Sequence, residues 1–225
     1  MKKLLLLSLL ALFGAATVQA KDSRTEYVTR VETCEAILRE FMGDSTTAIP
    51  AAVLQRARAI VIVNQFKAGF FFGVKDGYGV IMVKKADGRW SLPVLLATGE
   101  LSLGFQIGAN ASESVMVITD EATPRILFNQ RFNLGVDAKA VAGPSAAEVE
   151  KFNRALLDTP VIVYSKARGL YAGATVKTGW LERSDDANFT LYDTTYTMPE
   201  LLYSDWVKPA PEVVPLMDFV KQIAP

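Results

Sequence analysis

The segment KAGFFFGVKDGYGVIMVKKADGRWSLP, residues Lys67–Pro93, decides the fold expected for this chain. It contains two Asp-Gly pairs, Asp76-Gly77 and Asp87-Gly88, each flanked by aromatic and β-branched residues. Asp-Gly between such runs is a strong hairpin signal, because a type I′ turn requires positive φ at both central positions. The segment therefore predicts sequential antiparallel strands joined by two tight turns.

Each predicted turn has a consequence for strand pairing. With Asp76-Gly77 as a two-residue loop, the register implies three cross-strand pairs, Lys75–Tyr78, Gly73–Val80 and Phe71–Met82. The second turn is expected to reverse the chain between Lys85 and Arg89.

Basic residues gather at the ends of these predicted strands. We expect one end of the meander to carry four cations, Lys67, Lys84, Lys85 and Arg89. A second basic cluster contains Lys166 and Arg168. The aromatic residues flanking the two groups are Phe66, Phe70, Trp90 and Tyr171. Cations beside exposed aromatic rings suit a phosphate-bearing ligand, and charges at strand ends are also typical of solvated turns. Both interpretations stay open.

The N-terminus predicts export. Met1-Lys2-Lys3 is a short basic region, Leu4–Phe13 is an apolar run of 10 residues, and the segment ending at Ala20 has small or short residues at its last positions. This pattern is typical of a secretory signal peptide cleaved after Ala20. The run is too short for a permanent membrane span, although an uncleaved anchor is the alternative. We expect a periplasmic protein, soluble or peripherally associated with a membrane.

Composition argues against several classes of function. The chain has 24 basic and 24 acidic residues, and removal of residues 1–20 takes away two lysines, which leaves a net charge of −2. A nucleic-acid-binding protein usually carries a clear basic excess. The chain has no histidine, which excludes Ser-His-Asp triads and His-ligated zinc, and its single cysteine, Cys34, forms no internal disulfide. With no paired carboxylates in an apolar setting, we expect neither an enzyme nor a metal or cofactor.

Helices are predicted mainly toward the two ends of the mature chain. Residues Thr25–Met42 carry an amphipathic stripe, which suits packing on the core or, alternatively, on a membrane surface. Ser145–Leu157 begins with a capping box, Thr190–Tyr196 suits an edge strand, and Val213–Ile223 is a last helix. The expected fold is α+β: one domain, residues 21–225, with a strongly curled, mostly antiparallel, barrel-like sheet of short strands flanked by N-terminal and C-terminal helices.

Eight short segments form an ordered set along most of the chain. They are Ile49-Pro50 with Leu54 and Ala57, Lys67–Phe70, Gly77–Val80, Gly88–Pro93, Gly104–Gly108, Ala142–Pro144, Tyr164–Lys166 and Gly169–Gly173. Their order and spacing resemble the SYLF domain, most strongly over residues 49–192, and the chain is similar to exported bacterial members of that family. The resemblance implies binding rather than catalysis. Eukaryotic SYLF domains bind phosphoinositide-containing membranes and some bind actin, and bacterial members are described as lipid-binding.

These observations lead to one expected function and one alternative. We expect a non-catalytic periplasmic module that recognises anionic phospholipid head groups, such as phosphatidylglycerol or cardiolipin, through the two basic clusters. Actin is not an expected partner of an exported protein, and nucleic acid is not expected because the mature chain has no basic excess. The alternative is a structural or protein-interaction domain of the cell envelope, whose partner docks on apolar residues such as Phe70, Phe71 or Trp90.

Overall fold

Two long strands form the centre of the structure, a computed structural model that describes residues 23–68, 74–99, 111–148, 154–166 and 179–225. Strands β1 (Ala59–Ala68) and β2 (Val74–Val83) pair antiparallel along their whole lengths. Residues 60–63 and 80–83 are at most 1% exposed. Such continuous apolar runs are typical of strands covered on both faces.

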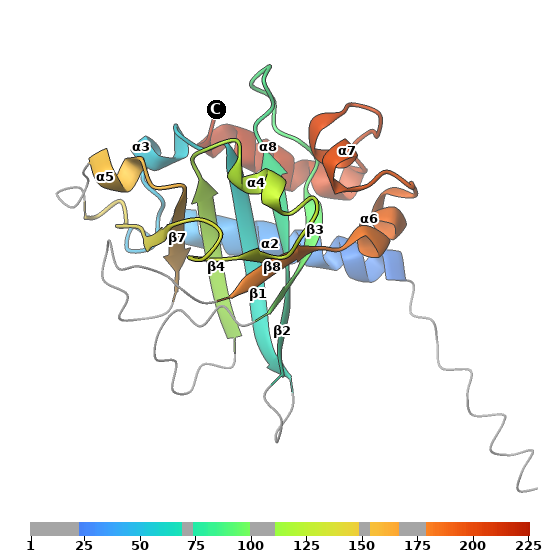
Figure 1. Cartoon of the computed structure of the whole chain (residues 1–225), viewed down its shortest axis with the longest axis horizontal. Helices are drawn as coiled ribbons and strands as arrows, with labels where there is room; N and C mark the ends of the chain where they lie inside the picture. The colour runs from blue at the N-terminus through green and yellow to red at the C-terminus, as the bar shows by residue number, and fades with distance from the viewer. Residues whose placement is uncertain (1–22, 69–73, 100–110, 149–153, 167–178) are drawn as a thin grey trace, which may run out of the picture.

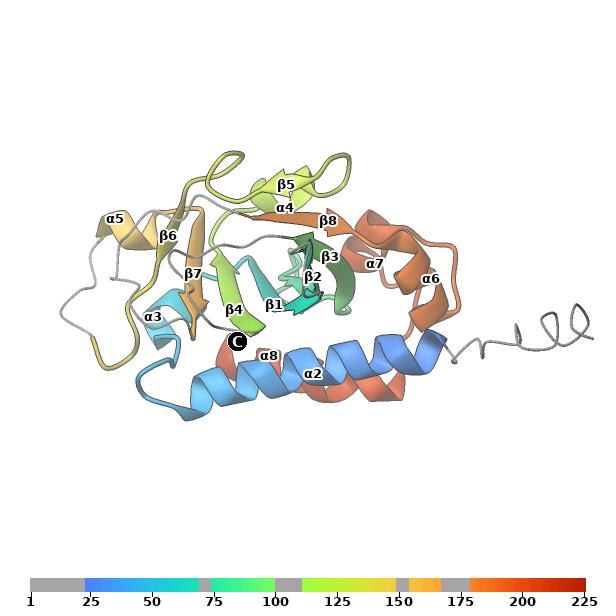
Figure 2. The ribbon, with the colours of Figure 1, turned by 90° about the horizontal axis from the view of Figure 1, so that it is seen from below.

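Six shorter strands extend the sheet on both sides. They are β3 (Val94–Gly99), β4 (Ala111–Ile118), β5 (Phe132–Asn133), β6 (Ala140–Ala142), β7 (Val161–Ser165) and β8 (Trp180–Arg183). The strand order is β5-β8-β3-β2-β1-β4-β7-β6, and every pairing is antiparallel except that of β6 with β7. Figure 2 shows β8 and β5 curling back over the central strands. The prediction of a curled, mostly antiparallel α+β fold is confirmed.

Two helices from opposite ends of the chain cover the other face of the sheet. Figures 1 and 2 show α2 (Ser23–Gly43) beside the C-terminal α8 (Val214–Ile223), which follows the short helix η2 (Pro211–Val213). The apolar stripe of α2 is at most 2% exposed, at Val31, Cys34, Ile37, Leu38 and Phe41. The amphipathic stripe therefore packs on the protein core.

The remaining helices are short: α3 (Ala51–Leu54) precedes β1, α4 (Thr123–Ile126) and α5 (Arg154–Leu157) connect strands, and α6 (Asp185–Tyr192) and α7 (Met198–Tyr203) follow β8. Ser145 donates its backbone N–H to the Glu148 carboxylate at 3.1 Å, as the capping box predicts, but α5 itself begins only at Arg154. The edge strand predicted at Thr190–Tyr196 is wrong, because α6 runs through Tyr192.

The predicted turn at Asp76-Gly77 is wrong, and so is the register derived from it. Both residues lie inside β2, where Asp76 pairs with Phe66 and Gly77 with Gln65. The glycine serves a different purpose there, because a Cβ at position 77 would stand 2.7 Å from the backbone oxygen of Asn64. Close approach of two strands, rather than positive φ, explains this Asp-Gly pair.

The second predicted chain reversal, between Lys85 and Arg89, is confirmed, but it is not a type I′ turn, because Gly88 has positive φ and Asp87 does not. Gly88 has φ of +84°, and its N–H donates to the carbonyl of Lys85 at 2.9 Å. The N–H of Lys85 donates to the carbonyl of Arg89 at 2.8 Å, and Lys84 pairs with Trp90. In Figure 1 this hairpin projects beyond the sheet next to α8.

Candidate functional site

The four cations predicted to share one rim lie at two opposite ends of the sheet. Lys67 pairs with Lys75, whereas Lys84 directly follows Val83, the partner of Ala59 at the other end of the same ladder. The nine residues from Lys75 to Lys84 span about 30 Å at about 3.3 Å per residue. We call the end at Val83 the hairpin end and the end at Ala68 the far end. The prediction that the four cations share one rim is wrong, because it depended on a turn at Asp76-Gly77.

Of the second basic cluster, Lys166 lies toward the far end. The N–H of Lys166 donates to the carbonyl of Glu113 at 3.4 Å, and Glu113 pairs with Asn64 of β1. Phe66 also belongs to the far end of β1. Phe70, Phe71, Arg168 and Tyr171 lie outside the described residues. Lys166 and Lys67 therefore both lie toward the far end, whereas Lys84, Lys85 and Arg89 lie at the hairpin end.

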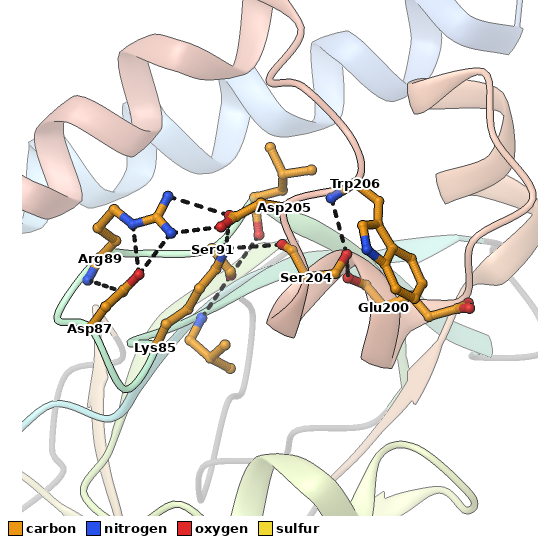
Figure 3. A network of polar contacts seen from close by, with 10 residues as sticks. Lys85, Asp87, Arg89, Ser91, Glu200, Ser204, Asp205 and Trp206 are labelled. Atoms are coloured by element: carbon orange, nitrogen blue, oxygen red, sulfur yellow. Dashed lines mark hydrogen bonds and ion pairs between the residues drawn. The ribbon is translucent and has the colours of Figure 1, made fainter.

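Two cations of the hairpin end, Lys85 and Arg89, are held in one polar network with carboxylates (Figure 3). Arg89 donates to Asp87 at 2.8 Å and to Asp205 at 2.6 Å. Lys85 donates to Asp205 at 2.6 Å and to the carbonyl of Ser204 at 2.9 Å. Lys84 Nζ donates to the backbone oxygen of Pro225. We call Lys84, Lys85, Asp87, Arg89 and Asp205 the hairpin cluster. It ties the hairpin to the segment after α7 and to the C-terminus.

The carboxylates offset the cluster's positive charge only in part. Hydrogen bonds from Arg89 and Lys85 lower the pKa of Asp205 to about 2, and those from Arg89 lower the pKa of Asp87. Both groups are therefore ionised at neutral pH. The exposed Arg58 lies beside the cluster, because its carbonyl accepts the N–H of Lys84 at 2.8 Å. Lys85 and Arg89 pair with the two carboxylates, and Lys84 contacts Pro225, so the hairpin cluster has a formal charge of +1. The exposed Arg58, next to Lys84 through the backbone, brings the formal charge of the hairpin end to +2.

The exposed aromatic residue beside this cluster is Trp206, not Trp90. Trp90 is 7% exposed and donates its indole N–H to the carbonyl of Ala224 at 2.8 Å, so its role as an apolar contact residue is wrong. Trp206 is 65% exposed, follows Asp205 directly, and lies 5.2 Å from the ring of Tyr196. Sequence reasoning missed Trp206. The sequence does contain a signal for it: Trp206 follows the polar pair Ser204-Asp205 and belongs to no amphipathic stripe, which is typical of an exposed residue.

Acid should weaken the hairpin cluster in a defined pH window. The pKa of Asp205 falls from 3.8 to about 2 on folding, so its ion pairs stabilise the fold above about pH 4 and are lost as pH falls through 2. We expect Asp205→Asn to lower stability at pH 7 and to flatten its dependence between pH 4 and 2. Urea midpoints at pH 7, 4 and 2.5 measure this, with the exposed Asp186→Asn as control. Equal slopes for wild type and Asp205→Asn would contradict the assignment.

Neither a metal centre nor a reactive thiol emerges in the part of the chain that the structure describes. No group of three His, Cys, Asp or Glu side chains there is placed to hold a metal ion. Cys34 is buried, and desolvation raises the pKa of its thiol to about 12, so it remains protonated. No helix among the described residues is both long and apolar enough to span a bilayer.

Comparison with known proteins finds one matching family model and several curated relatives. Residues 99–223 match the family model Ysc84, described as "Las17-binding protein actin regulator". The chain is 33% identical over 175 residues to SH3 domain-containing protein PJ696.02 of Schizosaccharomyces pombe, covering 76% of this chain and 40% of that protein. It is 31% identical over 171 residues to LAS seventeen-binding protein 3 of Saccharomyces cerevisiae, covering 75% and 37%.

Human SH3 domain-containing YSC84-like protein 1 is 28% identical over 180 residues, covering 77% of this chain and 53% of the relative. The chain thus spans about half the length, or less, of these curated relatives. The family model and the relatives cover most of the region in which the eight ordered segments occur, and the resemblance inferred from those segments is confirmed. The chain belongs to the Ysc84 family of SYLF-domain proteins.

Proposed function

We propose that this chain is a non-catalytic domain that binds reversibly to anionic phospholipid surfaces through its hairpin end, after export to the periplasm. The observation that carries the proposal is the juxtaposition of the exposed Trp206 with the hairpin cluster and Arg58, which together have a formal charge of +2. Indole rings suit the boundary between water and acyl chains because they combine a large apolar body with one polar N–H. The lipid binding implied by the family resemblance agrees with this assignment.

The expected affinity is low. A basic side chain near an anionic surface contributes on the order of 1 kcal/mol, and Asp87 and Asp205 offset two of the four cations. The remaining charge and the indole of Trp206 together supply a few kcal/mol, on the order of 2–4. Binding should therefore be reversible and sensitive to salt, because exposed charges are screened over about 8 Å at physiological ionic strength.

Reversing two cations of the hairpin end should abolish most of this binding. Arg58→Glu with Lys84→Glu changes the local charge by four units, and we expect at least a tenfold loss of affinity for vesicles containing 30% phosphatidylglycerol. Co-sedimentation with these vesicles and with neutral phosphatidylcholine vesicles measures the effect. Lys67→Glu is the matched control, because Lys67 lies at the far end.

Three outcomes would reject the hairpin end as the contact surface. They are equal binding to neutral and anionic vesicles, no binding to either, and a larger loss for Lys67→Glu than for the double variant. Circular dichroism of each variant must show an intact fold, since Lys84 also contacts the C-terminus.

A protein partner is the second candidate function. The descriptions of the family model and of the yeast relative name Las17 or LAS seventeen binding. Tyr196 and Trp206 form an aromatic pair, with ring centroids 5.2 Å apart, of which Trp206 is exposed. A protein docking on this pair would be lost with Trp206→Ala and retained in the Arg58→Glu, Lys84→Glu variant. Lipid binding would be weakened by both changes.

A further inference from the structure

The carboxylate of Asp205 lies between an ammonium and a guanidinium group at the hairpin end (Figure 3). Its Oδ1 accepts hydrogen bonds from Lys85 Nζ at 2.6 Å and from Arg89 Nη1 at 3.3 Å, and its Oδ2 accepts one from Arg89 Nη2 at 2.6 Å. Two N–H groups of one guanidinium and a neighbouring ammonium bind phosphate oxygens as they bind carboxylate oxygens. We call Lys85 and Arg89 the clamp. The chain's own carboxylate therefore occupies a position that suits an external anion.

Asp87 holds the guanidinium of the clamp in place. Its Oδ2 accepts a hydrogen bond from Arg89 Nε at 2.8 Å and lies 2.7 Å from Nη2, and its Oδ1 accepts the backbone N–H of Arg89 at 3.0 Å. Asp87 therefore contacts the side edge of the guanidinium, formed by Nε and Nη2, whereas Asp205 contacts the terminal edge, formed by Nη1 and Nη2. Because Asp87 belongs to the same turn as Arg89, it orients the guanidinium whether or not Asp205 is present.

Asp205, by contrast, belongs to a segment with few ties to the rest of the fold. Residues 204–210 lie between α7 and η2 and form no helix or strand. In the part of the chain that the structure describes, no backbone-to-backbone hydrogen bond joins residues 205–209 to another element, and the Asp205 carboxylate accepts only from Lys85 and Arg89. Its side chain is 59% exposed. Exposed ion pairs contribute little net stability, so rotation of this carboxylate into water costs little free energy.

A phosphate is the anion best suited to take the place of the Asp205 carboxylate. It has more acceptor oxygens than a carboxylate, so it can accept from both terminal nitrogens of Arg89 and from the ammonium of Lys85 together. Lys84 and the exposed Arg58 lie at the same end of the sheet, and their charges attract an incoming anion. A free carboxylate would compete poorly, because it matches Asp205 in charge but lacks the high effective concentration of a group tethered to the chain.

We propose that Lys85 and Arg89 form a phosphate-binding clamp that Asp205 occupies in the unbound protein, and that a phosphate monoester or diester displaces the Asp205 carboxylate. Asp87 stays on the side edge of Arg89 and positions it. The phosphate belongs either to a lipid head group or to a free phosphate ester, since both present the same oxygens. In the lipid case the inference rests on the proposed function and adds that the head group replaces Asp205 on contact with the membrane.

Two substitutions that remove the same charge test the clamp in the full chain. Asp205→Asn removes the carboxylate that competes with the phosphate, whereas Asp87→Asn removes a carboxylate from the same guanidinium and leaves that competitor in place. We expect Asp205→Asn to bind glycerol 3-phosphate about fivefold more tightly than wild type, and Asp87→Asn to change the affinity by about twofold or less. Titration followed by the Nε–Hε NMR signal of Arg89 gives both the affinity and the place of binding.

Vesicles separate the two sources of phosphate. If a lipid is the ligand, co-sedimentation with vesicles containing 30% phosphatidylglycerol should rank wild type, Asp205→Asn and Asp87→Asn in the same order as glycerol 3-phosphate does. Binding of glycerol 3-phosphate without any vesicle binding would support the clamp, assign a free phosphate ester and reject the proposed function. Vesicle binding that is equal in the three proteins would support the proposed function and overturn the clamp.

Stability measurements distinguish displacement of Asp205 from damage to the fold. Without phosphate, Asp205→Asn should melt at a lower temperature than wild type, because it loses ion pairs, and yet bind phosphate more tightly. Lys85→Gln, which keeps Arg89 and its NMR signal, should weaken glycerol 3-phosphate binding about fivefold. The clamp is overturned if glycerol 3-phosphate leaves the Arg89 signal unchanged in both wild type and Asp205→Asn, or if Asp87→Asn gains as much affinity as Asp205→Asn.

Discussion

Replacing Asn188 with leucine is expected to lower the free energy of unfolding by about 3–5 kcal/mol, which is the largest effect we expect from a single side chain. Asn188 is 0% exposed. Its Oδ1 accepts the N–H of Leu95 at 2.7 Å, and its Nδ2 donates to the carbonyls of Leu95 and Ser184 at 3.0 and 2.8 Å. Leucine has a similar volume but can make none of these bonds.

The size of the effect follows from where β8 ends. The ladder between β3 and β8 begins at Leu96 and Arg183, so no strand peptide of β8 reaches Leu95. The carboxamide of Asn188 replaces that missing peptide and joins α6 to the sheet. Without it, both backbone polar groups of Leu95 are buried without a partner, and each such group costs about 1–3 kcal/mol.

Urea unfolding of Asn188→Leu beside Asn129→Leu measures this effect. Asn129 is exposed, so the same substitution there should change the free energy of unfolding by no more than about 0.5 kcal/mol. A loss below about 1 kcal/mol at position 188 would show that the sheet finds other partners for Leu95.

Gly79→Ala is expected to destabilise the fold by about 2–3 kcal/mol. A Cβ at position 79 would stand 2.5 Å from the backbone oxygen of Ile62 and 3.3 Å from Val63 Cγ2. The oxygen belongs to β1, which pairs with β2 on one side and β4 on the other, so it cannot move without shifting the centre of the sheet. The added methyl therefore has to be accommodated by separating two buried strands.

The control for this substitution is Gly43→Ala at the end of α2, where nothing lies within 4 Å of an added Cβ. We expect that variant to be within about 0.5 kcal/mol of wild type. Thermal and urea unfolding should give the same ranking of the two variants. Equal stability of Gly79→Ala and wild type would mean that β1 and β2 are less closely apposed than the structure shows.

The two Asp-Gly pairs show when a local sequence signal predicts a turn correctly and when it does not. At Asp87-Gly88 strand β2 has already ended at Val83 and only the bridge between Lys84 and Trp90 continues the pairing, so the turn forms, with Gly88 at positive φ. At Asp76-Gly77 the same dipeptide lies within a ten-residue strand, because β1 offers a partner for every residue from Val74 to Val83. A dipeptide preference for a tight turn contributes less than the burial and hydrogen bonds of ten paired residues.

In the candidate site, too, some residues could be predicted from local sequence and others could not. Lys84, Lys85 and Arg89 were predicted as a group because one local turn brings them together. The structure adds Asp205, Trp206 and Arg58, which come from distant parts of the sequence. Only the packing of the segment after α7 against the hairpin brings Asp205 within 2.6 Å of both Lys85 and Arg89.

The amino-acid sequence by itself determined the class of fold, the helices α2 and α8, the second hairpin and membership of the Ysc84 family, because each depends on periodicity, turn chemistry or short ordered segments that are local in the chain. Tertiary structure alone decided which cations share a surface and which tryptophan is exposed. Those properties depend on strand register and on contacts between residues more than 100 positions apart, such as Arg89 with Asp205. A shift in strand register changes all of them while leaving every local signal unaltered.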